Sequence, residues 1–311
     1  MRRTQAAAIF VAVLAVACSQ SSKYVVLVDT FYAAAHEPGA IEQSLKQAEQ
    51  HTGASIKGIV VPPNSDSKLF ATLPLAGTTL ILTPLLAPDV GLLSRIYPTA
   101  RFAVMESGDN AATVEDKPTT AILFDRASAL LAAGVTLGKF AAGAVERPET
   151  GAVTTTGGVW ILFLADSASL RSDLATFREG LSAGLGAEAA TKAHFAVYDS
   201  PPGRDELRAT IQEARAAGAA GYALFVGRQN AYCFELLAGT AAKVVTSDLM
   251  GNDAYAREVL CSVEEPLSSA IQAVTEAGSA LPGIIHVQAL LEDSGADVIP
   301  RSSSPGKVPT R

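Results

Sequence analysis

The sequence predicts an α/β protein with two successive domains, each built on a parallel β-sheet. Short, continuous apolar runs alternate with longer segments that have helical periodicity, and this pattern restarts halfway along the chain. Such runs are typical of strands that are buried on both faces, as in a parallel sheet. The composition, with 49% hydrophobic and 18% charged residues, is that of a well-packed globular chain.

The first domain is predicted to begin at residue 24. A helix is expected between its first two strands, because Ile41, Leu45 and Ala48 recur at helical spacing after Pro38-Gly39. Strand, helix and strand at this spacing form a βαβ unit. The five predicted strands are apolar or β-branched runs bounded by Asp, Pro or Gly: Tyr24–Val28, Ile56–Val61, Thr79–Leu82, Phe102–Met105 and Ala121–Phe124.

The second domain repeats the pattern after an apolar helix over 127–142 and a Gly/Thr-rich turn region over 148–158. Its predicted strands are Val159–Leu164, His194–Tyr198, Tyr222–Val226 and Lys243–Thr246, with helices around 170–185 and 204–217. Near the end, the sequence predicts extended segments at 259–263 and 284–291 on either side of a helix over 267–277. Residues 300–311, rich in Ser, Pro and basic side chains, are expected to form a disordered tail.

The N-terminus has the layout of a bacterial export signal, because Arg2 and Arg3 precede an apolar run over 6–17. That run is shorter than the about 20 residues that a membrane helix needs, so residues 1–17 are predicted to be a cleaved signal. The stretch Leu14-Ala15-Val16-Ala17-Cys18 resembles the lipobox of bacterial lipoproteins. We therefore expect Cys18 to carry acyl chains such as palmitate, and residues 18–23 to form the spacer to a membrane of the cell envelope.

An ordinary signal peptidase site stays open as the alternative, since Ala15-Val16-Ala17 has the required small residues. The product would then be a secreted protein with a free N-terminal thiol. If Cys18 is lipidated, Cys233 and Cys261 are left as an even pair in an oxidising compartment. The sequence leaves open whether these two form a disulfide or are two buried thiols.

The net charge of −7 argues against nucleic acid as a partner, because such proteins need Lys and Arg to replace phosphate counterions. Enzyme motifs are also rejected. Gly180-Leu181-Ser182-Ala183-Gly184 fits G-x-S-x-G, but it lies within an amphipathic helix rather than on a strand-to-helix turn. Gly134 to Lys139 lacks the spacing and the Ser or Thr of a phosphate loop.

The histidines give no metal-binding spacing, because His36, His51, His194 and His286 lie far apart. No metal, no cofactor and no catalytic residue are therefore predicted.

Several segments, in shared order and spacing, resemble one family of type I periplasmic binding proteins. They are Tyr97-Pro98 with Arg101–Glu106, Phe177-Arg178-Glu179-Gly180-Leu181-Ser182-Ala183-Gly184, Glu213–Gly227, Ser247-Asp248, and Val259–Val263 with Ala270 downstream. The chain resembles the basic membrane protein family of purine-nucleoside-binding lipoproteins. The resemblance covers most of residues 24–291.

This resemblance implies two Rossmann-like lobes joined by a three-crossing hinge, the type I periplasmic binding protein fold. The N-terminal lobe would hold residues 24–124 plus about 263–282, and the C-terminal lobe 125–262 plus about 283–299. The function implied is a substrate-binding lipoprotein that delivers a small polar solute, such as a nucleoside or a sugar, to the permease of an ABC importer.

Candidate ligand-binding residues follow from the rule that ligands bind at the carboxyl ends of parallel strands. Carboxylates there can accept hydrogen bonds from hydroxyl groups, and aromatic rings can stack on a base or sugar. The alternative for each Asp is helix capping or turn formation. The first choices are Asp29, Glu106 and Asp248 with Phe31 or Tyr32, and the further candidates are Asp166, Phe177, Gly227, Arg228 and Glu265.

The sequence departs from the family near these positions. The family's acidic pair and Ser-Phe-Asn element are replaced by residues 33–38, and its glycines after Gly227 by Arg228-Gln229-Asn230. Thr246 replaces its first Asp at a strand end, and Glu265 replaces its Lys after the crossover strand. A Lys to Glu reversal would invert the local field. The second hypothesis is therefore a surface or periplasmic interaction or sensor lipoprotein that keeps the fold without transporting a solute.

Overall fold

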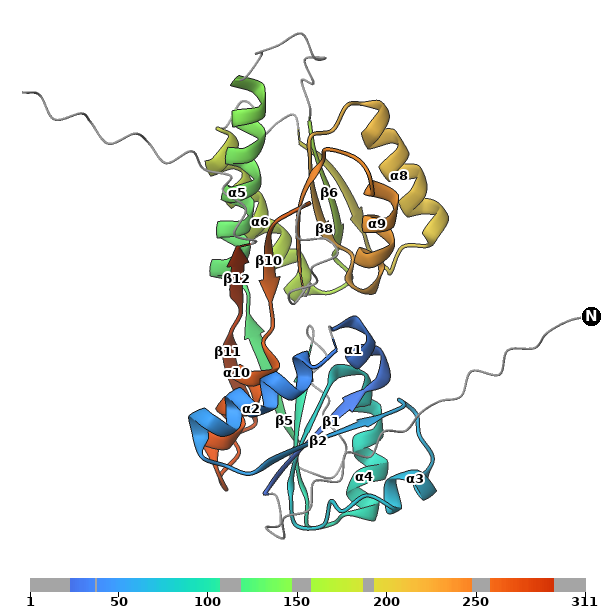
Figure 1. The fold of residues 1–311 in the computed structure, drawn as a ribbon, viewed down its shortest axis with the longest axis vertical. Coiled ribbons are helices and arrows are strands. Elements are labelled where there is room, and N and C mark those ends of the chain that lie inside the picture. The colour runs from blue at the N-terminus through green and yellow to red at the C-terminus, as the bar shows by residue number, and fades with distance from the viewer. Residues whose placement is uncertain are drawn as a thin grey trace, which may run out of the picture.

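Two lobes, each with a six-stranded sheet, lie one above the other along the long axis of the molecule (Figure 1). This arrangement comes from a computed structural model, which describes residues 23–36, 38–106, 119–146, 158–186, 193–247 and 258–293. The predicted signal segment, Cys18 and the predicted tail lie outside the described residues. Among the helices of the described segments, none has the length and apolar character needed to cross a membrane.

The sheet of the N-terminal lobe is parallel throughout, with each strand pair in the same direction. Every residue of β1 and β3 is buried, as the continuous apolar runs predicted. In spatial order, the strands are β11 (Ile284–Gln288), β5 (Thr119–Asp125), β4 (Arg101–Glu106), β3 (Thr79–Leu82), β1 (Tyr24–Asp29) and β2 (Ile56–Val61).

The sheet of the C-terminal lobe has the equivalent order, but one edge strand, β12, is antiparallel to its neighbour. Its other four pairings are parallel. In spatial order, the strands are β12 (Leu290–Asp293), β10 (Val259–Glu264), β9 (Lys243–Ser247), β8 (Gly221–Phe225), β6 (Val159–Leu164) and β7 (His194–Tyr198). The predicted α/β class with two parallel-dominated sheets is therefore confirmed.

Helices cover both faces of the N-terminal sheet. Ala48 of α2 and Ile271 of α10 pack into one apolar core, while Phe70 of α3 and Leu93 of α4 pack into the other. The Asp66 side chain caps α3 by accepting a hydrogen bond from the backbone N–H of Leu69 at 2.9 Å. The helical elements are α1 (Thr30–Ala35), α2 (Ala40–Thr52), α3 (Ser67–Ala71), the 3₁₀ turn η1 (Pro84–Asp89), α4 (Val90–Ile96) and α10 (Leu267–Ala277).

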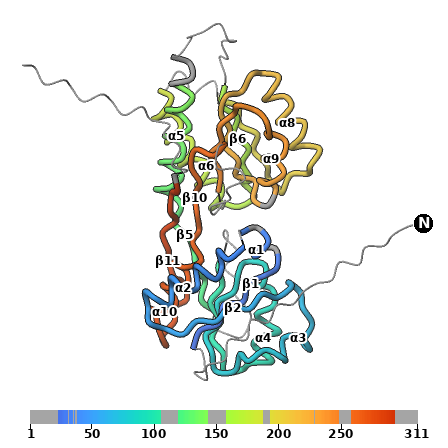
Figure 2. The backbone as a smooth tube through the Cα atoms, in the orientation of Figure 1, coloured from blue at the N-terminus to red at the C-terminus, as the bar shows by residue number. Residues whose placement is uncertain are grey.

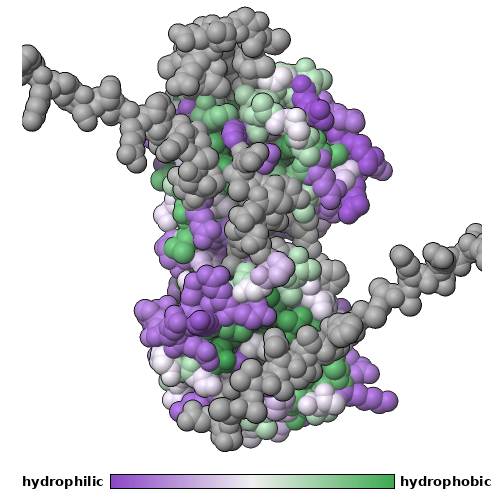
Figure 3. Space-filling view, in the orientation of Figure 1, coloured by the Kyte–Doolittle hydropathy of each residue, from purple (hydrophilic) through white to green (hydrophobic). Residues whose placement is uncertain are grey.

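The C-terminal sheet is covered by two pairs of helices. One pair is α5 (Ala127–Glu146) with α6 (Ala168–Leu185), and the other is α8 (Arg204–Ala216) with α9 (Asn230–Leu237), which follows the 3₁₀ turn η2 (Gly227–Gln229). Helices α2 and α8 expose a hydrophilic surface (Figure 3), as expected for amphipathic helices on a sheet.

Helices α5 and α6 are in direct backbone contact through four glycines. A Cβ atom at Gly138 would lie 2.7 Å from the backbone nitrogen of Leu185, and one at Gly180 would meet the main chain of Leu131. Gly134 and Gly184 have the same kind of contact. These are the glycines of the two rejected enzyme motifs, and their structural role is to let two helices approach closely.

The chain crosses between the lobes in three places (Figure 2): β5 to α5, β10 to α10, and β11 to β12. The last crossing corrects the predicted boundary, which assigned residues 283–299 to the C-terminal lobe. Strand β11 instead pairs with β5 of the N-terminal lobe, where Ile285 and Val287 are buried in the core. The chain enters the C-terminal lobe only after Ala289.

Candidate functional site

The carboxyl ends of the parallel strands of each lobe point toward the other lobe. Strand β5 leaves the N-terminal lobe for α5 of the C-terminal lobe, and β10 runs in the opposite direction toward α10. The other strands of each sheet, apart from β12, are parallel to these two. Accordingly, α1, which follows β1, lies on the side of its lobe that faces the C-terminal lobe (Figure 1). Parallel sheets bind ligands at this edge.

Asp29, at the end of β1, is held by internal partners and is only 1% exposed. Its Oδ1 accepts a hydrogen bond from the backbone N–H of Tyr32 at 2.8 Å, and its Oδ2 accepts one from the Thr83 hydroxyl at 2.8 Å. The Asp29 backbone N–H in turn donates to the Thr83 oxygen at 2.9 Å. The carboxylate therefore caps α1 and ties the end of β1 to the residue after β3, which is the capping role that the sequence left open.

Tyr32 and His36 form a stacked pair at the same edge, with ring centroids 4.2 Å apart. The Nδ1 atom of His36 lies 2.6 Å from the Tyr32 carbonyl oxygen. Because a carbonyl oxygen only accepts, Nδ1 carries the proton and Nε2 is left as an acceptor. Burial lowers the pKa of His36, although the Tyr32 carbonyl and the Asp29 carboxylate oppose this effect.

His36 is thus a neutral hydrogen-bond acceptor at neutral pH, a role that the sequence did not indicate. The available signal was the i,i+4 spacing from Tyr32 after a strand, which places two rings on one side of a helix.

Other predicted ligand residues are located in part. Phe31 lies in α1, Glu106 ends β4 and Arg228 lies in η2, but their side chains are outside the described part of the structure. Asp248, one residue beyond β9, lies outside the described residues altogether. Asp166 is exposed two residues beyond the end of β6, and Gly227 begins η2 with a φ of 60°, a conformation that favours glycine.

A buried amide joins the ends of β8 and β9. The Oδ1 of Asn230 accepts a hydrogen bond from the backbone N–H of Val226 at 2.9 Å, and its Nδ2 donates to the Thr246 oxygen at 3.2 Å. The Thr246 hydroxyl donates to the Leu224 carbonyl at 3.1 Å. Thr246 stands where the basic membrane protein family has an Asp. Its hydroxyl takes part in a buried hydrogen-bond network that contains no charged group.

Phe177 is a core residue rather than a ligand contact. Its side chain has no exposed surface, and its ring meets that of Phe225 edge-on at 5.3 Å. Helix α6 directs Phe177 into the core between the sheet and α5. The predicted ligand role of Phe177 is therefore replaced by a packing role.

Glu265, predicted as a ligand residue of reversed charge, is engaged by Arg126. The Nε of Arg126 donates to Oε1 of Glu265 at 2.5 Å, and its Nη2 pairs with the same oxygen. The Nη1 of Arg126 lies 3.6 Å from Oδ2 of Asp173 in α6. Burial raises the pKa of Asp173, and Glu265 and Asp125 add to this while Arg126 opposes it. Arg126 therefore offsets part of the negative charge that Glu265 brings to this position.

The two cysteines are separate buried thiols, which settles the question left open by the sequence. Cys233 in α9 belongs to the core on one face of the C-terminal sheet, and Cys261 in β10 belongs to the core on the other face. Burial raises the pKa of the Cys233 thiol to about 12.

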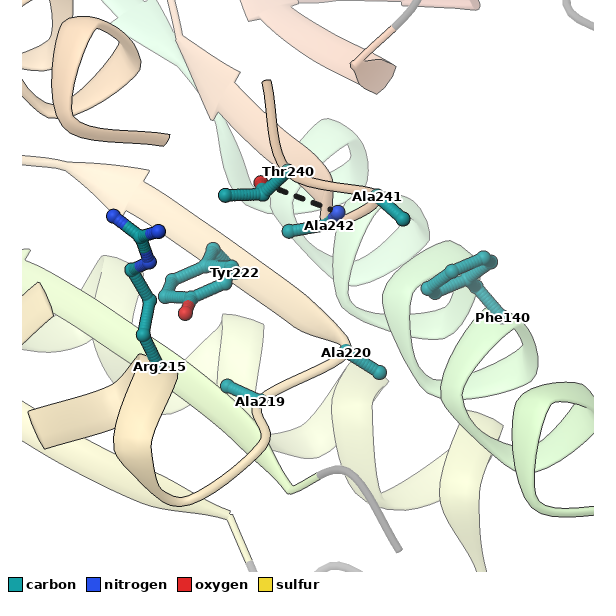
Figure 4. Close-up of a pocket in the computed structure, with 8 residues that line it drawn as sticks. All are labelled: Phe140, Arg215, Ala219, Ala220, Tyr222, Thr240, Ala241 and Ala242. Atoms are coloured by element: carbon teal, nitrogen blue, oxygen red, sulfur yellow. Dashed lines mark hydrogen bonds between the residues drawn. The ribbon is translucent and has the colours of Figure 1, made fainter. Parts of the chain in front are cut away.

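A cavity of about 360 Å³ lies away from the facing strand ends (Figure 4). It is found at the amino ends of β8 and β9, so it is separate from the candidate site. Its lining residues are Phe140, Arg215, Ala219, Ala220, Tyr222, Thr240, Ala241 and Ala242. Among the residues that the structure describes, no group of three or more His, Cys, Asp or Glu side chains could hold a metal ion.

No family model matches the sequence. No curated protein matches it either. Solved structures do match. An ABC transporter solute-binding protein from Aeropyrum pernix K1 aligns with a TM-score of 0.56 and 12% identity, over 87% of this chain and 76% of that one. One from Conexibacter woesei DSM 14684 has a TM-score of 0.52 and 13% identity, over 88% and 92%.

The same architecture occurs in a transcriptional activator of the comK gene from Bacillus halodurans, with a TM-score of 0.59 and 12% identity, over 89% of this chain and 92% of that one. Identities this low establish the fold alone, and the resemblance to the basic membrane protein family is not confirmed by these comparisons. With two parallel-dominated sheets and three crossings, the chain has the type I periplasmic binding fold found in ABC transporter solute-binding proteins.

Proposed function

We propose that this protein is a lipid-anchored receptor that binds a small polar solute between its lobes and delivers it to the permease of an ABC importer. The observation that carries this proposal is the arrangement of the two sheets, whose carboxyl strand ends face each other across a three-segment hinge. Hinge closure around a ligand is the motion that such an arrangement permits. The solved structures of solute-binding proteins with this fold support it.

The described groups at the facing edges favour a neutral solute rich in hydroxyl or amino groups. His36 offers an acceptor nitrogen beside the Tyr32 ring, and Asp166 is an exposed carboxylate at the facing edge of the other lobe. Acceptors with an aromatic neighbour suit a nucleoside or a sugar. The resemblance to the basic membrane protein family favours a nucleoside. We infer a binding role without catalysis, because these groups bind a ligand but include no activated nucleophile.

The anchor and the location rest on the N-terminal sequence. Cys18 would carry the lipid and hold the receptor at the cell envelope, facing the periplasm or the exterior. Mass spectrometry of the N-terminal peptide from the native host is the direct measurement. A diacylated or triacylated Cys18 is expected, and an unmodified Cys18 thiol would favour plain secretion.

Solute binding is tested by a thermal-unfolding screen of the chain from residue 18 with Cys18→Ser, against nucleosides, nucleobases, sugars and amino acids. A ligand at 100 times its Kd adds about 2.7 kcal/mol to the native state. For a protein of this size, that raises Tm by roughly 2 °C or more. A shift confined to one class would name the substrate class. Asp166→Asn should reduce it, and the exposed control Glu213→Gln, in α8, should not.

A second function, an interaction or sensor lipoprotein without solute transport, is favoured by two observations. Asp29 and Phe177 were both selected as ligand residues. The Asp29 carboxylate instead caps a helix, and the Phe177 ring lies in the core. The fold also occurs in a protein described as a transcriptional activator. No thermal shift across the whole panel would support this second function and contradict the first.

A further inference from the structure

The three crossing segments must absorb any rotation of one lobe against the other, so their contacts decide which lobe angles are stable. The first crossing contacts both of the others. The Asp125 carbonyl accepts hydrogen bonds from the backbone N–H of Ala289 and from Nε2 of Gln288, both at 2.9 Å. On its other side, Arg126 holds Glu265 of the second crossing. The crossings therefore form one connected unit.

Asp173 is a partner of Arg126 that lies outside this unit. It belongs to α6, and the glycine contacts fix α6 against α5 in the body of the C-terminal lobe. Its Oδ2 lies 3.6 Å from Nη1 of Arg126, farther than Glu265 Oε1 is from Nε. The contact of Arg126 with Glu265 thus joins two hinge segments, whereas its contact with Asp173 joins the hinge to the C-terminal lobe.

The three side chains are shielded enough for charge to matter. Arg126, Asp173 and Glu265 expose 20%, 16% and 13% of their side-chain surfaces. Ion pairs in such partly buried places are screened less by water and salt than exposed pairs. One guanidinium pairs with two carboxylates, so replacing it removes an ion-pair partner from each of them.

We propose that Arg126 is a hinge latch: its bond to Glu265 keeps the first two crossings together at every lobe angle, and its contact with Asp173 holds the angle seen here. Breaking the Asp173 contact frees the lobes to rotate while the hinge stays intact. Breaking the Glu265 contact loosens the hinge itself. Arg126 is a positioning residue in this proposal, which needs no bound solute.

The test measures the distance between the lobes without any ligand, by pulsed electron spin resonance. Spin labels are placed at two exposed positions, Arg95→Cys in α4 and Gln212→Cys in α8, with Cys18→Ser and the buried Cys233 and Cys261 unchanged. Asp173→Asn should broaden the distance distribution or shift its centre by more than about 2 Å. Arg126→Lys should do the same, because a lysine cannot donate in a fork to two carboxylates.

The matched control is Glu276→Gln. It removes an exposed carboxylate that lies 3.9 Å from His51 and joins α10 to α2 within one lobe, so the lobe distance should not change. Circular dichroism melting would identify a variant that fails to fold. If folded Asp173→Asn and Arg126→Lys both give the wild-type distribution, the latch is wrong. Because no ligand is present, this result is independent of the solute screen.

Discussion

The two lobes share a strand order but are held together differently. In the C-terminal lobe, α5 and α6 meet backbone to backbone through four glycines. In the N-terminal lobe, α2 and α10 pack through side chains such as Ala48 and Ile271. Sheets with the same strand order can therefore be covered by helices that pack through side chains or by helices in direct backbone contact. Side-chain packing can adjust to substitution by rotamer changes, whereas backbone contact leaves no atom that can move aside.

The ends of the central strands differ as well. A buried carboxylate, Asp29, closes the end of β1 with Thr83, while a neutral amide, Asn230, closes the ends of β8 and β9 with Thr246. Both arrangements satisfy buried polar groups, but only the first places a charge at the edge that faces the other lobe. The difference shows that a carboxylate at a strand end can be required by the fold before any ligand is considered.

The largest effect is expected from adding one methyl group to the glycine contact. Gly180→Ala should destabilise the protein by about 3 kcal/mol or more, because the new carbon meets the main chain of Leu131. The matched change in the N-terminal lobe, Gly91→Ala in α4, meets no atom within 4 Å. It should stabilise by about 0.5–1 kcal/mol, since alanine is the better helix former. Urea unfolding measures the free energy of unfolding of both variants. Equal losses of stability in the two variants would contradict the comparison.

An intermediate effect is expected from exchanging the two strand-end groups. Asp29→Asn replaces the acceptor of the Thr83 hydroxyl with a donor, and Asn230→Asp replaces the donor to Thr246 with an acceptor. Each substitution should lower the free energy of unfolding by about 1–3 kcal/mol, the usual penalty for a buried polar group left unpaired. Urea unfolding of both variants checks this. If Asp29→Asn left stability unchanged but abolished solute binding, its carboxylate would be a ligand contact rather than a cap.

The smallest effect concerns His36 and appears only as a pH dependence. Its folded pKa lies below the ordinary value of 6.5, so the unfolded chain binds the proton more tightly. Stability should therefore fall as the pH drops from above 6.5 through the folded pKa. Stability curves of the wild type and His36→Asn between pH 8 and 5 check this. The two curves should diverge below about pH 6.5, and parallel curves would contradict the assignment.

The sequence predicted the strands well, because each is a continuous buried run such as Thr79–Leu82. It also placed the helix at 267–277, where apolar residues have a clear period. Strand β11 was assigned to the wrong lobe, since its partner β5 lies far away in the chain and local pattern carries no information on pairing. Helix α9 was not predicted, because its eight residues are too few to show a clear helical period.

The site was less predictable than the fold. Strand-end rules selected Asp29 and Asp166 as candidates but could not distinguish a helix cap from a ligand contact. The roles of Arg126 and Asn230 depend on tertiary contacts with Glu265, Asp173 and Thr246, which no local pattern encodes. His36 differs, because its partner Tyr32 lies only four residues away in the chain. The glycines of α5 and α6 did carry a usable signal, since pairs of glycines four residues apart in successive helices favour close helix contact.

The path of the last crossing has a consequence for the order of folding. The first lobe to be synthesised lacks its core helix α10 until residue 277 has been made and its edge strand β11 until residue 288 has been made. By then most of the second lobe has already been synthesised. The C-terminal lobe also waits for β12, which follows directly. Neither lobe can therefore mature alone during synthesis, and the two must finish folding together once the chain is nearly complete.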